Sequence, residues 1–141
     1  MLTTIEKMIA LKSVDFFSQT SGEVLAGLAE ILVEVEVPAG QAVFVKDDTG
    51  SSMYFIVQGR VQVHDGSSVF GEFGEGEAFG EMALLDSSPR SASITALADT
   101  LLLELDQEPF YELLEDYSDV SRHIMQLLTR RLRQLMADES R

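Results

Sequence analysis

The spacing of apolar residues changes along the chain, and it predicts helices first and strands after them. Residues 3–11 and 21–32 carry apolar side chains at helical spacing, and Ser21 can cap the second of these helices. Residues 33–37, Val-Glu-Val-Glu-Val, alternate strictly between apolar and charged, which is typical of a half-buried strand. We therefore predict N-terminal helices over 1–32, followed directly by a β region.

Short apolar runs separated by glycines predict a β-roll over residues 33–105. Glycines recur throughout 40–80, and tight turns and bulges need residues that tolerate positive φ. Gln58-Gly59 lies between two apolar runs, like the turn of a hairpin. The pattern favours a compact antiparallel barrel or sandwich. After a turn at 38–40, the expected strands are 53–57, 60–64, 69–73, 91–96 and 101–105.

The helical period returns in the last part of the chain. Asp106 and Ser118 can each cap a helix, the first running to about residue 116 and the second to about residue 137. We expect these helices to occupy 106–138 and to complete a single domain over 1–141. The long helix has one apolar stripe, made of Val120, Ile124, Leu127, Leu128, Leu132, Leu135 and Met136.

Composition narrows the possible functions. The 141 residues are 45% hydrophobic and include no cysteine, so disulfides, thiolate zinc sites, iron–sulfur clusters and thiol nucleophiles are excluded. His64 and His123 are the only histidines, too few for a histidine-rich metal centre, and we expect no metal. No apolar run approaches the roughly 20 residues of a membrane helix, and the N-terminus lacks a signal-peptide core. We expect a soluble, cytoplasmic protein with no catalytic residues.

Charge argues against nucleic acid as a partner. The chain has 24 acidic and 10 basic residues, a net charge of −14, and nucleic-acid binding needs clustered cations. The charge is also uneven, because residues 118–141 hold 5 arginines and only 3 acids. We expect these arginines to form a solvated helix face or to pair with the acidic body.

Residues 79–92, Phe-Gly-Glu-Met-Ala-Leu-Leu-Asp-Ser-Ser-Pro-Arg-Ser-Ala, combine groups suited to a small phosphate ester. Gly80 lets the backbone approach a ligand and begin a short helical turn, whose first amides favour anions. The Glu81 carboxylate can accept hydrogen bonds from a hydroxyl group. Arg90 offers a forked cation for a phosphate, and Ser91 adds a hydroxyl beside it. Together they describe a site for a small phosphate with a free sugar hydroxyl.

This segment closely resembles the phosphate-binding cassette of the cyclic nucleotide-binding domain family. The family pattern is aromatic-Gly-Glu-aliphatic-small-Leu, a short loop, and then Arg-Ser/Thr/Ala-Ala. Residues 54–63 also resemble an early strand pair of the family, and the resemblance covers roughly 14–130. It implies an antiparallel double-stranded β-helix, or jelly roll, with flanking helices. The residues that fit the pattern are Phe79, Gly80, Glu81, Met82, Ala83, Leu84, Arg90, Ser91 and Ala92.

The resemblance also implies a role for each site residue. Glu81 would accept from the ribose 2′-hydroxyl, and Arg90 would pair with the exocyclic phosphate oxygens. Backbone amides near Ala83 and 91–92 would complete the phosphate shell, and Ser91 could reach the phosphate or a purine substituent. The residues expected to wall the purine are Val63, Phe73 and Phe79.

The sequence departs from the family in two places. Many members have Gly-Asp before the Tyr-Phe strand, where this chain has Asp47-Asp48, and we expect a changed turn there without loss of the site. Transcriptional members continue into a helix-turn-helix domain, whereas about 11 residues follow the resemblance here. We therefore expect a ligand-sensing module that relays binding through 107–116 and 119–137, in trans or to an effector domain of a longer parent protein.

Alternative functions remain open at this stage. A metal-dependent enzyme on a similar roll would need several converging histidines and carboxylates. A ligand-free scaffold or dimerisation module would keep the roll without using the cassette. Cyclic AMP is favoured over cyclic GMP on resemblance alone, because Ser91 permits both. The helix at 119–137 could pair in a homodimer or fold back onto the roll of a monomer.

Overall fold

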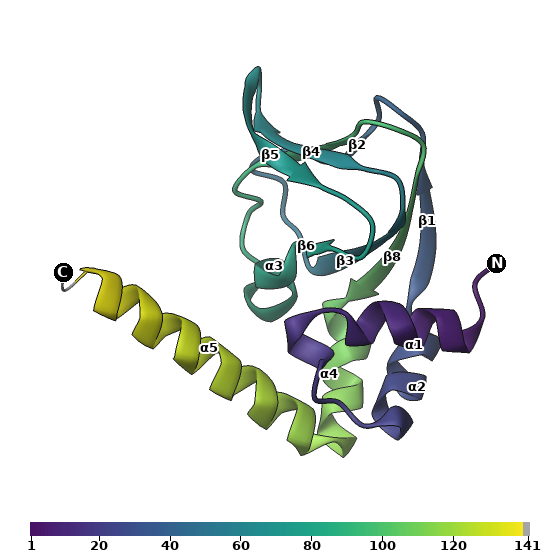
Figure 1. Cartoon of the computed structure of the whole chain (residues 1–141), viewed down its shortest axis with the longest axis vertical. Coiled ribbons are helices and arrows are strands. Elements are labelled where there is room, and N and C mark those ends of the chain that lie inside the picture. The colour runs from purple at the N-terminus through teal and green to yellow at the C-terminus, as the bar shows by residue number, and fades with distance from the viewer. Residues whose placement is uncertain (140–141) are drawn as a thin grey trace.

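In the computed structural model, residues 1–139 form a β-roll with helices gathered at one end (Figure 1). The helices are α1 (Thr4–Lys12), the 3₁₀ turn η1 (Asp15–Phe17), α2 (Gly22–Ile31), α3 (Glu81–Asp86), α4 (Gln107–Asp116) and α5 (Ser118–Glu139). The strands are β1 (Val33–Val37), β2 (Ala42–Phe44), β3 (Ser52–Gln58), β4 (Val61–Asp65), β5 (Ser68–Phe73), β6 (Ala78–Phe79), β7 (Ser93–Ala96) and β8 (Thr100–Asp106).

The strands make two four-stranded antiparallel sheets, in the orders β1-β8-β3-β6 and β2-β7-β4-β5. Neighbours in these orders are mostly distant in sequence, as expected when one chain winds back and forth between the two sheets of a roll. The predicted fold class, an antiparallel jelly roll flanked by helices, is therefore confirmed. The cassette helix α3 lies at the helical end of the roll, between β6 and the loop that leads to β7 (Figure 1).

The observed element ends differ from the predicted ones where local signals are weak. Strand β6 has two residues, too few for any periodicity to show, and β2 and η1, of three residues each, were also missed. Strand β7 begins at Ser93, not at residue 91, so Ser91 and Ala92 lie in the loop after the cassette helix. Ser118 is the first residue of α5 instead of its cap.

Asp106 precedes α4 as predicted, but its side chain does not cap that helix. Its carboxylate Oδ1 instead accepts hydrogen bonds from the hydroxyls of Ser51, at 2.7 Å, and Ser52, at 3.0 Å. Asp106 is the N-cap residue of α4, as predicted, while its carboxylate is bonded to two serines that are distant in the sequence. The consequence is a direct polar connection between the start of β3 and the start of α4.

Two apolar clusters hold the molecule together. One fills the roll itself and includes Ile56, Val61 and Leu102. The other joins the helices to the first sheet, and its centre is formed by fully buried aromatic rings. Phe17 packs edge-on against Phe110, with ring centroids 6.0 Å apart. Because this second cluster includes residues of α1, α2, α4 and α5, the helices share one core beneath the roll.

Helix α5 packs its first part on the body, and its last turns extend beyond it (Figure 1). Val120 and Ile124 are buried, whereas the Leu132 and Leu135 side chains are 58% and 61% exposed. Arg131 makes the predicted contact with the acidic body, because its Nη2 lies 3.3 Å from Asp15 Oδ2. Over residues 1–139, we find no helix both long and apolar enough to cross a lipid bilayer.

Candidate functional site

A cavity of about 240 Å³ opens between α3, the loop that follows it and the inner face of the roll. This volume is a little below the range of about 300–1,000 Å³ that is usual for small-molecule pockets. Every residue that the sequence predicted for the site lines this one cavity, the cassette and the expected purine wall alike. The lining residues are Phe44, Val63, Phe73, Phe79, Gly80, Glu81, Met82, Ala83, Ser88, Pro89, Arg90, Ser91, Ala92 and Ile94.

The turn into α3 depends on Gly80. Its φ of +82° is left-handed, a conformation that a side chain disfavours. A Cβ built there would also lie 2.9 Å from Arg90 Nη1 and 3.0 Å from the Ser52 carbonyl oxygen. The Ala83 amide donates to the Gly80 carbonyl at 3.1 Å, so in this structure that amide is engaged within the turn.

Arg90 is a buried cation at the edge of the cavity. Its side chain is 7% exposed, its Nη2 donates to the Ser52 carbonyl at 2.9 Å, and its Cζ lies 4.0 Å above the Phe44 ring. Its Nε is buried and has no hydrogen-bond partner in the described part of the chain. Burial lowers the pKa of the guanidinium, although the nearby Tyr54 and Glu104 act in the opposite direction. The group therefore keeps donor capacity in a poorly hydrated place, which favours an anionic partner.

Glu81 begins α3 on the same cavity and is partly exposed. Among residues 1–139 we find no hydrogen bond or ion pair made by its carboxylate. The carboxylate therefore has free acceptor positions, which a ligand hydroxyl could use. Met82 is 63% exposed on the next position, and Ser91 is exposed in the loop beside Arg90.

The apolar side of the cavity is built from strand residues. Val63 on β4 and Phe73 on β5 are partly buried, and Phe79 on β6 is buried. The Phe73 and Phe79 rings are nearly parallel, at 11°, with centroids 6.1 Å apart. Phe79 also stacks on Tyr54, at 5.3 Å, so the predicted wall continues into the interior of the roll.

Tyr54 and Glu104 form a polar pair behind this wall. The Tyr54 hydroxyl donates to Glu104 Oε2 at 2.8 Å. Burial raises the pKa of Tyr54 strongly, and the hydrogen bond to the Glu104 carboxylate adds to the rise. Tyr54 is therefore a neutral hydrogen-bond donor at physiological pH, and both Tyr54 and Glu104 act to raise the pKa of the nearby Arg90, which burial lowers.

Side chains of α4 hold the C-terminal end of the cassette helix. Gln107 Nε2 donates to the Leu84 carbonyl at 3.0 Å, and the Tyr111 hydroxyl donates to the Leu85 carbonyl at 2.9 Å. The Ser87 hydroxyl donates to Gln107 Oε1 at 2.7 Å. Any displacement of α3 must break these bonds or carry α4 with it.

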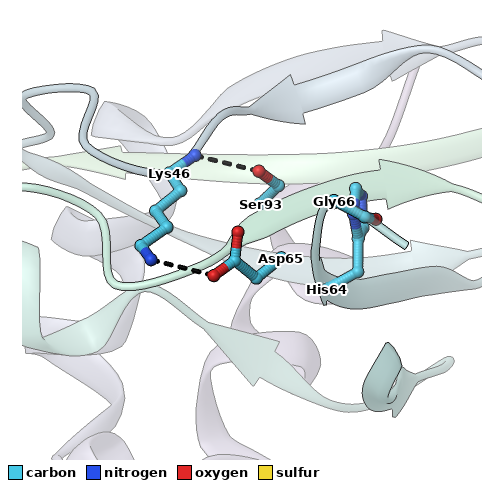
Figure 2. A network of polar contacts seen from close by, with 5 residues as sticks. All are labelled: Lys46, His64, Asp65, Gly66 and Ser93. Atoms are coloured by element: carbon cyan, nitrogen blue, oxygen red, sulfur yellow. Dashed lines mark hydrogen bonds and ion pairs between the residues drawn. The ribbon is translucent and has the colours of Figure 1, made fainter. Parts of the chain in front are cut away.

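His64 has a structural place on the outer side of the roll. Its Nδ1 donates to the Gly66 carbonyl at 2.9 Å, and its Nε2 lies 2.8 Å from Thr95 Oγ1. Figure 2 shows two neighbouring polar contacts, in which the Lys46 amide donates to the Ser93 hydroxyl and Lys46 Nζ pairs with Asp65 at 2.8 Å. These two contacts of Lys46 connect the loop after β2 to β7 and to β4. In residues 1–139 we find no group of three or more histidines and carboxylates placed to hold a metal ion.

Sequence reasoning missed several residues that shape the site. The Phe44 ring packs against the Arg90 guanidinium, but Phe44 belongs to a three-residue strand that is too short to show periodicity. Gly50 resembles any turn glycine in the sequence, yet the space beside it is filled by Arg90. Ser52 contributes a backbone carbonyl, which no side-chain pattern can indicate.

Comparison with known proteins identifies the family. The sequence profile of the family described as "Cyclic nucleotide-binding domain" matches residues 34–117. The chain belongs to this family. The match includes the roll from the second residue of β1 onward, the cassette helix and α4, so the cyclic nucleotide-binding domain accounts for the part of the chain that forms the cavity.

Individual relatives of this cyclic nucleotide-binding domain agree with that assignment. The chain is 38% identical over 102 residues to the Cyclic AMP receptor protein of Thermus thermophilus, covering 69% of this chain and 47% of that protein. It therefore spans about half the length of this relative. The crystal structure of the N-terminal domain of a Streptomyces coelicolor transcriptional regulator superposes with a TM-score of 0.86 at 27% identity, covering 92% of this chain and 94% of that one.

A further solved structure is the regulatory domain of Toxoplasma gondii PKA with cAMP. It superposes with a TM-score of 0.72 at 26% identity, over 80% of this chain and 45% of that chain. The similarity to both bacterial regulators and a kinase regulatory domain confirms the family resemblance that residues 79–92 indicated.

Proposed function

We propose that this domain is a regulatory, non-catalytic module that binds a 3′,5′-cyclic nucleotide, cyclic AMP in the first place. One observation carries the proposal: a buried arginine and a carboxylate with free acceptor positions line one small cavity with an aromatic wall. Family membership supports the ligand class. A cation for the phosphate, an acceptor for a sugar hydroxyl and flat apolar rings for a base are the groups that such a ligand requires.

In this proposal Arg90 pairs with the exocyclic phosphate oxygens and Glu81 accepts from the ribose 2′-hydroxyl. Amides near Ala83 and at Ser91–Ala92 complete the phosphate shell. The purine lies against Val63, Phe73 and Phe79. For the Ala83 amide to reach a ligand, its 3.1 Å bond to the Gly80 carbonyl must lengthen, so binding would tighten or rotate the first turn of α3.

The preference for cyclic AMP is supported by the relatives. The Thermus protein is named for cyclic AMP, and the Toxoplasma domain was solved with it. Exposed Ser91 beside Arg90 gives no discrimination of its own, because a hydroxyl can both donate and accept. A competition titration in which cyclic GMP binds tenfold more tightly would reverse the assignment.

We propose that the output is carried by α4 and α5. The bonds from Gln107 and Tyr111 to α3 connect the cassette to α4, and α5 follows α4 directly. The exposed Leu132 and Leu135 on the outer part of α5 would pair with a second copy in a homodimer or contact an effector domain of a longer parent protein. The cytoplasmic location stays a prediction.

Isothermal titration with cyclic AMP, cyclic GMP and 5′-AMP tests the proposal. We expect both cyclic nucleotides to bind, cyclic AMP more tightly, and 5′-AMP to bind far more weakly. Arg90→Ala should remove binding, whereas Arg60→Ala, at an arginine that is 60% exposed and paired with Glu72, should not. Absence of heat and of any thermal stabilisation with either cyclic nucleotide would favour the ligand-free scaffold instead.

A further inference from the structure

The Arg90 guanidinium lies in a narrow slot instead of extending freely into the cavity. One side is the Phe44 ring, 4.0 Å from Cζ, and another is the Ser52 carbonyl, which accepts from Nη2. Gly80 lies close to Nη1. A single hydrogen bond from a five-donor group does not fix its orientation, so the slot must do so by shape.

Gly50 forms the remaining side of this slot. A Cβ built on Gly50 would lie 2.1 Å from Arg90 Nε, 2.4 Å from Cζ and 2.6 Å from Nη2. These three closest atoms all belong to the guanidinium. The Gly50 backbone has no positive φ, so its conformation alone does not demand glycine. What excludes a side chain at position 50 is therefore the Arg90 head group.

Arg90 Nε faces this glycine and is the one buried side-chain nitrogen or oxygen without a partner that we find in the described chain. A buried donor is normally satisfied, and leaving one open favours any ligand that supplies an acceptor nearby. The close approach to Gly50 thus keeps the guanidinium buried but incompletely bonded.

We propose that Gly50 is a positioning residue for Arg90. The missing side chain leaves the space in which the guanidinium rests, and with the Phe44 ring it fixes the plane of the donors before a ligand arrives. The consequence for nucleotide affinity rests on the proposed function, whereas the placement of Arg90 does not. Preorganisation of this kind favours affinity because the ligand need not order a long flexible side chain.

The first test is a thermal-denaturation cycle without ligand. Gly50→Ala should lower the melting temperature in the wild-type background, because the new methyl group must displace Arg90. In the Arg90→Ala background the same change should leave the melting temperature unchanged or raise it, since the clashing atoms are gone and alanine restricts the unfolded chain. Gly22→Ala, where a Cβ meets nothing within 4 Å, is the matched control and should behave alike in both backgrounds.

The second test observes Arg90 directly. Its buried Nε–H should give a slowly exchanging ¹H–¹⁵N arginine signal, assigned by its loss in Arg90→Ala. Gly50→Ala should shift or remove this signal, and Gly22→Ala should leave it in place. With cyclic AMP, Gly50→Ala should weaken binding at least tenfold.

The outcomes separate the two proposals. If the wild type binds no cyclic nucleotide but the melting cycle and the Nε–H signal respond as expected, the proposed function fails and the positioning role stands. If Gly50→Ala lowers the melting temperature equally in both backgrounds, Gly50 serves the fold and the positioning role is overturned. An unchanged Nε–H signal in Gly50→Ala also overturns it.

Discussion

Replacing Arg90 by methionine should separate ligand binding from folding, because the two depend on Arg90 in opposite ways. The substitution keeps an unbranched apolar stem and removes the charge. Folding loses the charged hydrogen bond to the Ser52 carbonyl, worth about 1.5–3 kcal/mol, and the contact with the Phe44 ring, worth about 0.5–2 kcal/mol. The substitution also removes two costs of folding. One is the burial of a cation, which costs several kcal/mol, and the other is the unpartnered Nε, which costs about 1–3 kcal/mol.

These contributions nearly cancel, so the unfolding free energy without ligand should change by no more than about 1–2 kcal/mol. Binding has no such compensation, because the phosphate would lose the one buried cation found in residues 1–139. Removing one member of a desolvated charge pair costs about 2–5 kcal/mol, or roughly 30- to several thousand-fold in affinity. The expected variant is therefore a folded protein of nearly wild-type stability that no longer binds cyclic AMP.

Urea denaturation followed by circular dichroism measures the first quantity, and calorimetric titration measures the second. Arg60→Met, the same change at an exposed arginine, should alter neither by much. A stability loss of about 3 kcal/mol or more in Arg90→Met would refute the reasoning, because it would make Arg90 chiefly a structural residue. Wild-type affinity in the variant would refute the site.

Three further predictions follow from other parts of the structure. Glu81→Gln should weaken binding of cyclic AMP more than binding of its 2′-deoxy analogue; equal losses for both ligands would mean that Glu81 does not recognise the hydroxyl. Burial alone would raise the pKa of Asp106, but hydrogen bonds from the hydroxyls of Ser51 and Ser52 and from the Gln107 backbone outweigh it, so the pKa lies below the ordinary value of an aspartate. A group with a lowered folded pKa stabilises the fold above its unfolded pKa, and this contribution is lost as the pH falls through the folded pKa. The stability lost in Asp106→Asn should therefore be largest near neutral pH and shrink in acid; a pH-independent difference in urea midpoints would contradict this. Substituting both Leu132 and Leu135 by Glu should abolish any dimer seen by light scattering, and a mass near 15.6 kDa for the wild type at all concentrations would show that there is none to abolish.

The cassette could be predicted from the sequence because its chemistry is local. A glycine, an acid and, nine positions later, an arginine form one continuous segment, and the fold only has to close it around a cavity. The long alternating strand at 33–37 and the amphipathic helices were predictable for the same reason, since each carries its own period.

What the sequence could not supply is the environment that distant residues create. The position of Arg90 depends on the Phe44 ring, the Gly50 backbone and the Ser52 carbonyl, which come from two other segments and show no pattern of their own. Periodicity also indicates a face without indicating what covers it. Ile124 and Leu135 lie on the same predicted stripe, yet the first is 4% exposed and the second 61%.

The cassette helix α3 is only six residues long and is bracketed by two left-handed residues, Gly80 at φ +82° and Ser87 at φ +46°. A helix this short is not stable in water by itself, so it depends on contacts that other parts of the chain make with its ends. At the C-terminal end these contacts come from Gln107 and Tyr111 of α4. Amide hydrogen exchange within 81–86 therefore reports on the position of α4. A displacement of α4 during signalling would appear as faster exchange in α3, and no label on α4 or α5 would be needed to detect it.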